Sequence, residues 1–159
     1  MKRSVCLATI LFLTFLSSAQ PSDNLKLRAV EVETGREVAA VSVVTGDDIE
    51  VEYTHSMYGV RQKEVFSIGH DGCFRLLKMV FGSMAAAVYY DPDPGQSLIY
   101  KDNVWVLKRN GENYQTLRYR VSPGTGHVLK TRNRTIDLSG QSDESGRLIE
   151  IALDKRGPT

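Results

Sequence analysis

The side chains of this sequence best suited to chemistry are two histidines, a glutamate and a tyrosine that alternate with apolar residues. In segment 49–56 the odd-numbered positions are apolar apart from Tyr53 and His55. Residues two apart on a β-strand point to the same face of a sheet, and the apolar face is the core face. We therefore expect the side chains of Tyr53 and His55 to point inward.

The glutamate lies on the next alternating segment, 60–68, where Glu64 shares a face with Phe66. If this segment pairs antiparallel with the preceding one, Glu64 lies across from His55 or from Tyr53, depending on the register. A carboxylate among apolar side chains is costly unless it is paired, and an imidazole or a phenol is the natural partner. The cluster is either a buried hydrogen-bond network that sets the register or the polar part of a ligand pocket.

The second histidine, His127, continues an inward-facing apolar pattern across the turn at 122–126. Two imidazoles and one carboxylate suit zinc or another divalent ion, so His55, Glu64 and His127 are a candidate metal site. The same three residues are the candidates for an alternative function, a metal-dependent or general-base enzyme. The sequence does not identify which metal or other cofactor, if any, the protein binds.

A second candidate site is a stripe of basic residues on the opposite face of the hairpin that carries His127. Arg118 and Arg120 lie on one segment, and Lys130, Arg132 and Arg134 are expected across from them. Facing like charges destabilise a sheet, so the stripe either borrows acidic neighbours or binds an anionic partner. The second case describes a structural or adhesive module that docks through this stripe.

Signals for nucleophilic catalysis are weak. No Gly-x-Ser-x-Gly elbow occurs in the sequence. No basic residue or helix start lies beside Cys73 to activate its thiol, so we expect a small buried hydrophobe on a strand. A non-enzymatic protein is the favoured interpretation.

Short β-strands must position these side chains. From Leu25 onward the sequence shows period-two alternation between turn signals, with no sustained helical pattern. A change of phase after Ala29 predicts a β-bulge. Strands at this spacing, about nine or ten of them, predict an all-β fold: a single antiparallel β-sandwich or a partly open barrel. Residues 20–159 form one domain in this interpretation.

The first nineteen residues are predicted to be a secretory signal peptide. Lys2 and Arg3 precede a nearly unbroken apolar run from Val5 to Leu16, and small residues follow it up to Ala19. The run is shorter than the roughly 20 residues that span a bilayer, so we expect cleavage and no stable membrane anchor. The mature protein would be secreted or periplasmic. A formal charge of +1 is too near balance to indicate nucleic acid as a partner.

Five short motifs occur in one order along the chain. They are Tyr53–Ser56, Glu64–Phe66, Phe81–Ala87, Asp102–Trp105 and Val121–His127. This succession resembles the prokaryotic domain-of-unknown-function family numbered eighteen-fifty, small exported proteins often encoded beside or fused near TAXI-type TRAP transporter permeases. The resemblance covers roughly Leu25 to Leu138. Met84–Ala87 departs from the family's Phe-Gly-Ala-Gly, which puts a glycine-dependent turn at this point in doubt.

The resemblance implies a location and a neighbour, and no reaction. Together with the inward polar cluster, it favours an exported module that binds a membrane transporter or its solute. The expected ligand-binding residues are Tyr53, His55, Glu64 and His127.

Overall fold

The computed structural model describes residues 24–90, 94–109, 111–140 and 146–155, so the expected signal peptide lies outside the described residues. Their twelve strands and one helix follow in this order: β1 (Asn24–Glu31), β2 (Glu37–Val44), β3 (Asp48–Thr54), β4 (Arg61–Ile68), β5 (Phe74–Phe81), α1 (Met84–Tyr89), β6 (Ser97–Lys101), β7 (Val104–Lys108), β8 (Asn113–Tyr114), β9 (Thr116–Val121), β10 (Val128–Lys130), β11 (Thr135–Asp137) and β12 (Arg147–Lys155).

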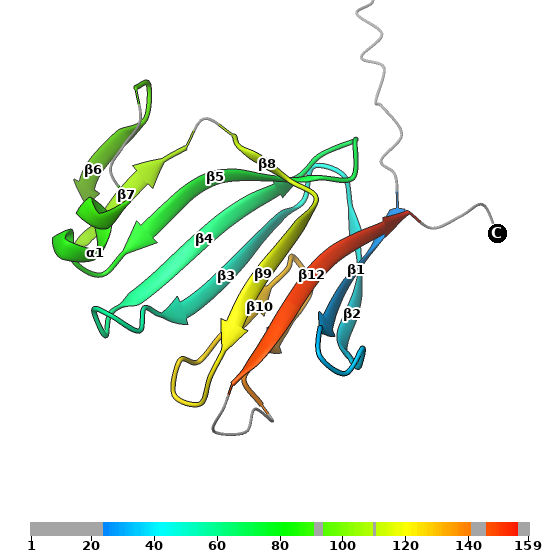
Figure 1. The fold of residues 1–159 in the computed structure, drawn as a ribbon. Coiled ribbons are helices and arrows are strands. Elements are labelled where there is room, and N and C mark those ends of the chain that lie inside the picture. The colour runs from blue at the N-terminus through cyan, green and yellow to red at the C-terminus, as the bar shows by residue number, and fades with distance from the viewer. Residues whose placement is uncertain (1–23, 91–93, 110, 141–145, 156–159) are drawn as a thin grey trace, which may run out of the picture.

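The strands form two antiparallel sheets packed as a sandwich (Figure 1). A four-stranded sheet has the order β2-β1-β12-β9, and an eight-stranded sheet has the order β11-β10-β3-β4-β5-β7-β6, with β8 beside β5. The predicted all-β sandwich is confirmed, and the strand count exceeds the expected number. Segments 113–121 and 128–137 each hold two short strands, β8 and β9 in the first and β10 and β11 in the second.

The core lies between the sheets and is built by alternation. On β1 the side chains of Leu25, Leu27 and Ala29 are buried at alternate positions, and Ile49 and Val51 do the same on β3. Alternate positions reach the core because successive strand residues point to opposite faces. The predicted bulge is present, since the pairing of β1 with β2 shifts register between Ala29 and Val30.

Helix α1 was not predicted. Its N-cap is Ser83, whose Oγ accepts a hydrogen bond from the backbone N–H of Ala86 at 3.3 Å. Alanine has the highest helix propensity, and Ala86 and Ala87 pack into the core. A helix therefore occupies the position at which the family resemblance put a glycine-dependent turn in doubt. No helix among the described residues is long and apolar enough to cross a membrane.

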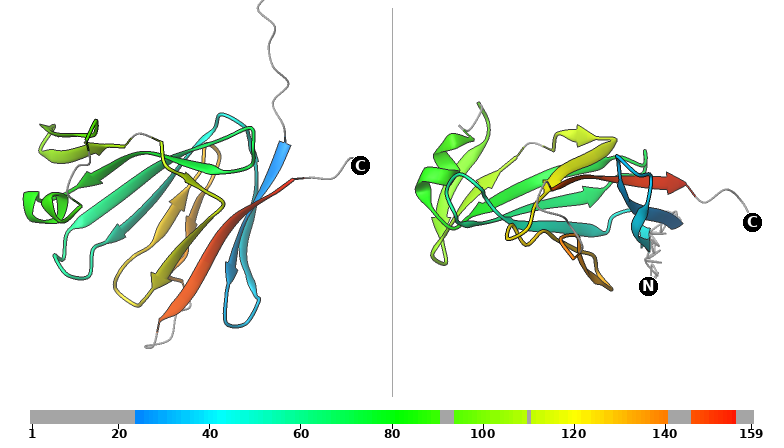
Figure 2. Two further views of the ribbon diagram at one scale, coloured as in Figure 1. Left: turned by 45° about the horizontal axis from the view of Figure 1, so that its top comes forward. Right: turned by 60° about the horizontal axis from the view of Figure 1, so that its bottom comes forward.

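The small sheet covers only part of the large one. After β8, which pairs with β5, the chain leaves the large sheet and joins the small sheet as its edge strand β9. Figure 2 shows β6, β7 and α1 at the end of the large sheet remote from β1 and β2. The candidate site lies where β9 passes over β3, β4 and β5.

Candidate functional site

Glu64 is the centre of a half-buried polar cluster. The hydroxyl of Tyr53 donates a hydrogen bond to its Oε1 at 2.6 Å, and the hydroxyl of Tyr119 donates to its Oε2 at 2.6 Å. Burial, reinforced by the Glu64 carboxylate, raises the pKa of both phenols above the usual value. Both phenols therefore stay protonated at neutral pH and act as donors to Glu64.

The register of β3 and β4 places Val51 across from Glu64, in place of the predicted His55 or Tyr53. Glu64 pairs with Val51, and Tyr53 pairs with Gln62, so the prediction that Glu64 lies across from His55 or Tyr53 is wrong. The turn sets this register, because the backbone N–H of His55 donates to the carbonyl of Val60 at 2.9 Å. Tyr53 still reaches Glu64 because diagonal neighbours on one face lie within range of long side chains.

The fully buried Gln62 belongs to the cluster and was missed by the sequence analysis. Its side chain is 1% exposed, and its Nε2 lies 2.7 Å from the hydroxyl of Tyr53 and 3.2 Å from Oε1 of Glu64. The hydroxyl of Tyr90, at the end of α1, lies 3.1 Å from the same nitrogen. Alternation along β4 would have found Gln62, since it shares the parity of Glu64.

His127 points inward as predicted and is 4% exposed. Its ring stacks on Tyr53, with centroids 4.8 Å apart and an interplanar angle of 9°. The Thr125 hydroxyl donates to the carbonyl of Ser122 at 2.6 Å and lies 2.9 Å from Nδ1 of His127. Because that hydroxyl has one proton, Nδ1 carries the imidazole hydrogen and Nε2 is left as an acceptor.

Two effects hold the His127 imidazole in its neutral form. Burial, reinforced by the positive charge of Arg61, lowers the pKa of His127 to about 4. A neutral ring stacked on Tyr53 adds no positive charge to the cluster. Glu64 forms no ion pair with any described residue, so nothing in this part of the chain neutralises it by direct contact.

His55 lies apart from the Glu64 carboxylate. It follows the last residue of β3 and is half-buried; its Nδ1 accepts a hydrogen bond from the backbone N–H of Met57 at 3.3 Å. Its ring contacts those of Tyr58, Tyr89 and Tyr90. The candidate metal site does not form, since the described residues contain no group of three histidine, cysteine or acidic side chains placed to hold an ion.

Two cavities flank the cluster, and both are lined by Tyr53, Tyr90, Arg118 and Tyr119. The first has a volume of about 360 Å³ and extends over β4 and β5. Its further lining residues are Glu64, Phe66, Leu76, Met79, Arg109, Tyr114, Thr116 and Leu117. The second has a volume of about 320 Å³ and extends past His55 and His127. The arrangement offers a ligand an apolar floor, aromatic walls and several hydrogen-bond acceptors.

The basic stripe is divided between the two sheets, so the expected facing of its two halves is wrong. Strand β9, with Arg118 and Arg120, pairs with β12, whereas β10 pairs with β3 and β11. Arg118 forms an ion pair with Glu150 at 2.6 Å. Arg132 and Arg134 are exposed in the turn between β10 and β11.

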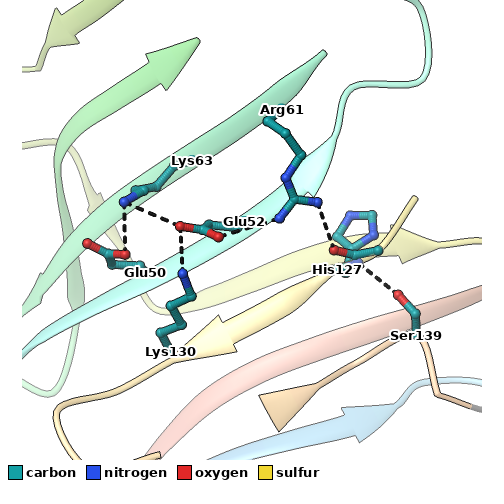
Figure 3. A network of polar contacts seen from close by, with 8 residues as sticks. Glu50, Glu52, Arg61, Lys63, His127, Lys130 and Ser139 are labelled. Atoms are coloured by element: carbon teal, nitrogen blue, oxygen red, sulfur yellow. Dashed lines mark hydrogen bonds and ion pairs between the residues drawn. The ribbon is translucent and has the colours of Figure 1, made fainter. Parts of the chain in front are cut away.

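Lys130 joins an ion-pair network on the outer face of the large sheet. It contacts Glu52 at 2.8 Å, and Lys63 contacts Glu50 at 3.1 Å and Glu52 at 3.3 Å. Figure 3 shows Glu52 between Lys63, Lys130 and Arg61. The acidic neighbours on β3 thus neutralise Lys130.

Cys73 is not on a strand. It precedes β5 in a turn, where its backbone N–H donates to Oδ1 of Asp71 at 3.1 Å. Its thiol is free and half-buried.

Residues 49–138 match the sequence model of one family, described as a domain of unknown function (DUF1850). The match begins in β3 and ends just after β11, so it includes Tyr53, Glu64, Tyr119 and His127. No curated protein and no solved structure matches the chain.

Proposed function

The chain belongs to the DUF1850 family, and we propose that it is an exported, non-enzymatic module that binds a small ligand in the cavities around Glu64. The observation that carries this proposal is the carboxylate itself. Glu64 lies in a cavity wall, is held by two tyrosine hydroxyls and forms no ion pair with a described residue. Such a carboxylate, fixed in place and without a direct counter-ion, can accept hydrogen bonds from a ligand.

Apolar and polar surfaces meet in this site as they do in small-molecule pockets. Phe66, Leu76 and Met79 are buried and form the floor of the first cavity. The polar groups around them are few and are fixed by hydrogen bonds, which is typical of sites that orient a ligand. The Thr125 hydroxyl beside His127 donates its proton to the carbonyl of Ser122, so that ring does not activate it as a nucleophile, and we propose binding without a reaction.

Ligand-dependent thermal stability tests the binding proposal. The purified chain from residue 20 onward is heated with members of a panel of small amines, amino acids, carboxylates and short peptides. At 100 times its Kd a ligand stabilises the folded protein by about 2.7 kcal/mol. We expect Tm to rise for at least one class.

Two variants locate the bound ligand. Glu64→Gln keeps the shape of the site and removes its carboxylate, whereas Glu52→Gln makes the same change on the outer face of the neighbouring strand. The shift of Tm should persist in Glu52→Gln and disappear in Glu64→Gln. Absence of a shift with every class, or an equal shift in both variants, would contradict the proposal.

Export to the periplasm or the medium is a further part of the proposal, supported by the basic start, apolar run and small residues of positions 1–19. Expression of all 159 residues in a bacterium should yield a mature protein that begins at Gln20. N-terminal sequencing of the exported fraction measures this directly. Retention of the uncleaved chain inside the cell would be evidence against export.

We also propose a TRAP-type solute transport system as the context of binding, with the resemblance of the five motifs to the family as its support. Co-expression with a tagged TAXI-type permease, followed by purification in detergent, should recover the chain with the permease. An unrelated permease is the control. Recovery with both permeases, or with neither, would argue against the association.

A further inference from the structure

Strand β9 ends the small sheet and has a free hydrogen-bonding edge. Among the described residues it pairs with β12 and with no other strand. The backbone of Leu148 on β12 points away from β9, because its carbonyl accepts from the N–H of Val32 at 2.9 Å and its own N–H donates to Oε2 of Glu33 at 3.3 Å. Backbone groups alternate in direction along an antiparallel ladder. The backbone groups of Ile149 and Ile151 therefore point toward β9 and bond to their paired residues there.

The alternate residues of β9 direct their backbone groups to the open side. Tyr119 and Leu117 pair with Ile149 and Ile151, so the N–H and C=O groups of the other three residues, Thr116, Arg118 and Arg120, point away from β12. No described group bonds to the backbone of these three residues. The edge is about 13 Å long at the usual rise per strand residue.

The same three residues line the cavities of the candidate site. Thr116 and Arg118 border the first cavity, and Arg118 and Arg120 border the second. The cavities thus lie along the free edge of β9, above the inner face of the large sheet. An extended peptide placed there would complete the backbone hydrogen bonds of β9, as in other cases of strand addition.

The floor of this space defines which side chains such a peptide carries. Alternate side chains of an added strand point down toward Phe66, Leu76 and Met79, which favour apolar partners. Glu64 lies among them without an ion pair in the described chain, and Tyr53 and Tyr119 flank it. A carboxylate between aromatic rings is complementary to a cationic side chain.

We infer that the free edge of β9 binds an extended peptide segment by strand addition, with a lysine side chain directed to Glu64 between apolar neighbours. This inference rests on the proposed function, because it assigns a ligand class to the same site. The six free backbone groups of Thr116, Arg118 and Arg120 supply the pairing, and Glu64 supplies the selectivity.

The probe is the capped pentapeptide acetyl-Val-Thr-Lys-Thr-Val-amide, whose alternate side chains fit the floor. Its Kd is measured by calorimetry with the chain from residue 20 onward. A peptide with norleucine in place of lysine removes the charge and keeps the length, and should bind at least tenfold more weakly. The tenfold preference should vanish in Glu64→Gln and persist in Glu52→Gln.

N-methylation tests the strand pairing itself. One peptide is methylated on the backbone nitrogens of its second and fourth residues, and another on those of its third and fifth residues. Only one of the two sets faces β9 in a paired strand, so one peptide should lose binding and the other should keep it. Equal binding of both peptides would overturn strand addition.

A proline on the edge provides a second variant that does not touch Glu64. Arg120→Pro removes an N–H that points away from β12, and proline is tolerated at such edge positions. Circular dichroism should show an unchanged fold, while peptide binding falls at least tenfold. A folded Arg120→Pro protein with unchanged affinity would contradict the inference.

The outcomes separate this inference from the proposed function. Butylamine that binds as tightly as the lysine peptide, or another small ligand that binds when no peptide does, would overturn the peptide inference and support the proposed function. Failure of every ligand would overturn both.

Discussion

Strands β3 and β4 carry carboxylates on both faces, and the two faces accommodate them by different means. On the inner face, Glu64 accepts hydrogen bonds from the uncharged hydroxyls of Tyr53 and Tyr119. On the outer face, Glu52 is surrounded by cations, with Lys130 at 2.8 Å and Lys63 at 3.3 Å (Figure 3). Neighbouring residues of one hairpin thus have two different electrostatic environments.

This difference in environment distinguishes the ion pairs of the outer face from the candidate binding site on the inner face. The outer ion pairs are partly exposed, and such pairs contribute little to stability because water and salt screen them. The inner carboxylate is the shared acceptor of the Tyr53 and Tyr119 hydroxyls, which face the interior, and an interior donor left unsatisfied costs more than an exposed pair contributes. Its negative charge also meets no described cation, which leaves it available to a ligand. Four predictions follow from this contrast.

Removal of the inner carboxylate should have the largest effect. Glu64→Ala leaves the hydroxyls of Tyr53 and Tyr119 without their acceptor, so we expect a loss of about 2–3 kcal/mol in the free energy of unfolding. Urea denaturation at pH 7 measures it. The matched variant Glu52→Ala should cost at most about 1 kcal/mol. Equal losses would erase the distinction between the faces.

Acid should destabilise the inner face first. The folded pKa of His127, about 4, lies below its ordinary value of 6.5, so the unfolded chain binds more protons between these values. Stability is therefore fully present above pH 6.5 and falls as the pH drops from 6.5 to 4. We expect this residue to account for about 1–2 kcal/mol after allowance for screening.

Unfolding curves from pH 7 to 5 isolate this contribution. On the outer face, the pKa of Glu52 is lowered, chiefly by Lys130, from an ordinary value of 4.5, so its stabilisation is lost only at lower pH. His127→Gln removes the titrating group and should flatten the dependence between pH 6.5 and 5. An unchanged slope in this variant would assign the dependence to another group.

Loss of a single inner hydroxyl should have an intermediate effect. Tyr119→Phe removes one hydrogen bond to Glu64 and keeps the ring, so we expect a loss of about 1 kcal/mol. The loss should be the same in 0.1 M and 1 M NaCl, because the Tyr119 hydroxyl is buried and uncharged. Urea denaturation at the two salt concentrations checks this, and a loss that disappears in 1 M NaCl would contradict it.

The smallest effect is expected on the outer face. Lys130→Met removes the contact with Glu52 and keeps most of the apolar stem, so the loss should be about 0.5 kcal/mol at low salt. It should vanish in 1 M NaCl, where the Debye length is about 3 Å. A salt-independent loss would show that packing of the lysine stem matters more than its charge.

Much of the fold and part of the site were predictable from alternation alone. Period-two patterns predicted the all-β sandwich and the bulge after Ala29, and parity directed Tyr53, Glu64 and His127 inward. These inferences succeeded because the side-chain period of a strand is local and needs no knowledge of partners. The same parity also directs Gln62 inward.

The sequence predicted poorly which strands pair with one another and in which register. The turn at 55–60 places Val51 across from Glu64, where His55 or Tyr53 was expected. The transfer of β9 to the small sheet separated Arg118 and Arg120 from Lys130. Both errors arise because turn geometry and sheet exchange depend on contacts between distant segments.

By itself, the sequence determined which side of each strand a residue occupies, and hence that an acid, a phenol and an imidazole face the interior. Only the tertiary structure decided which of them meet. Tyr119 reaches Glu64 across 55 positions because the chain crosses from the large sheet at β8 to the small sheet at β9. That same crossing leaves the edge of β9 beside the cavities without a neighbouring strand from the part of the chain that the structure describes, because β9 ends the small sheet.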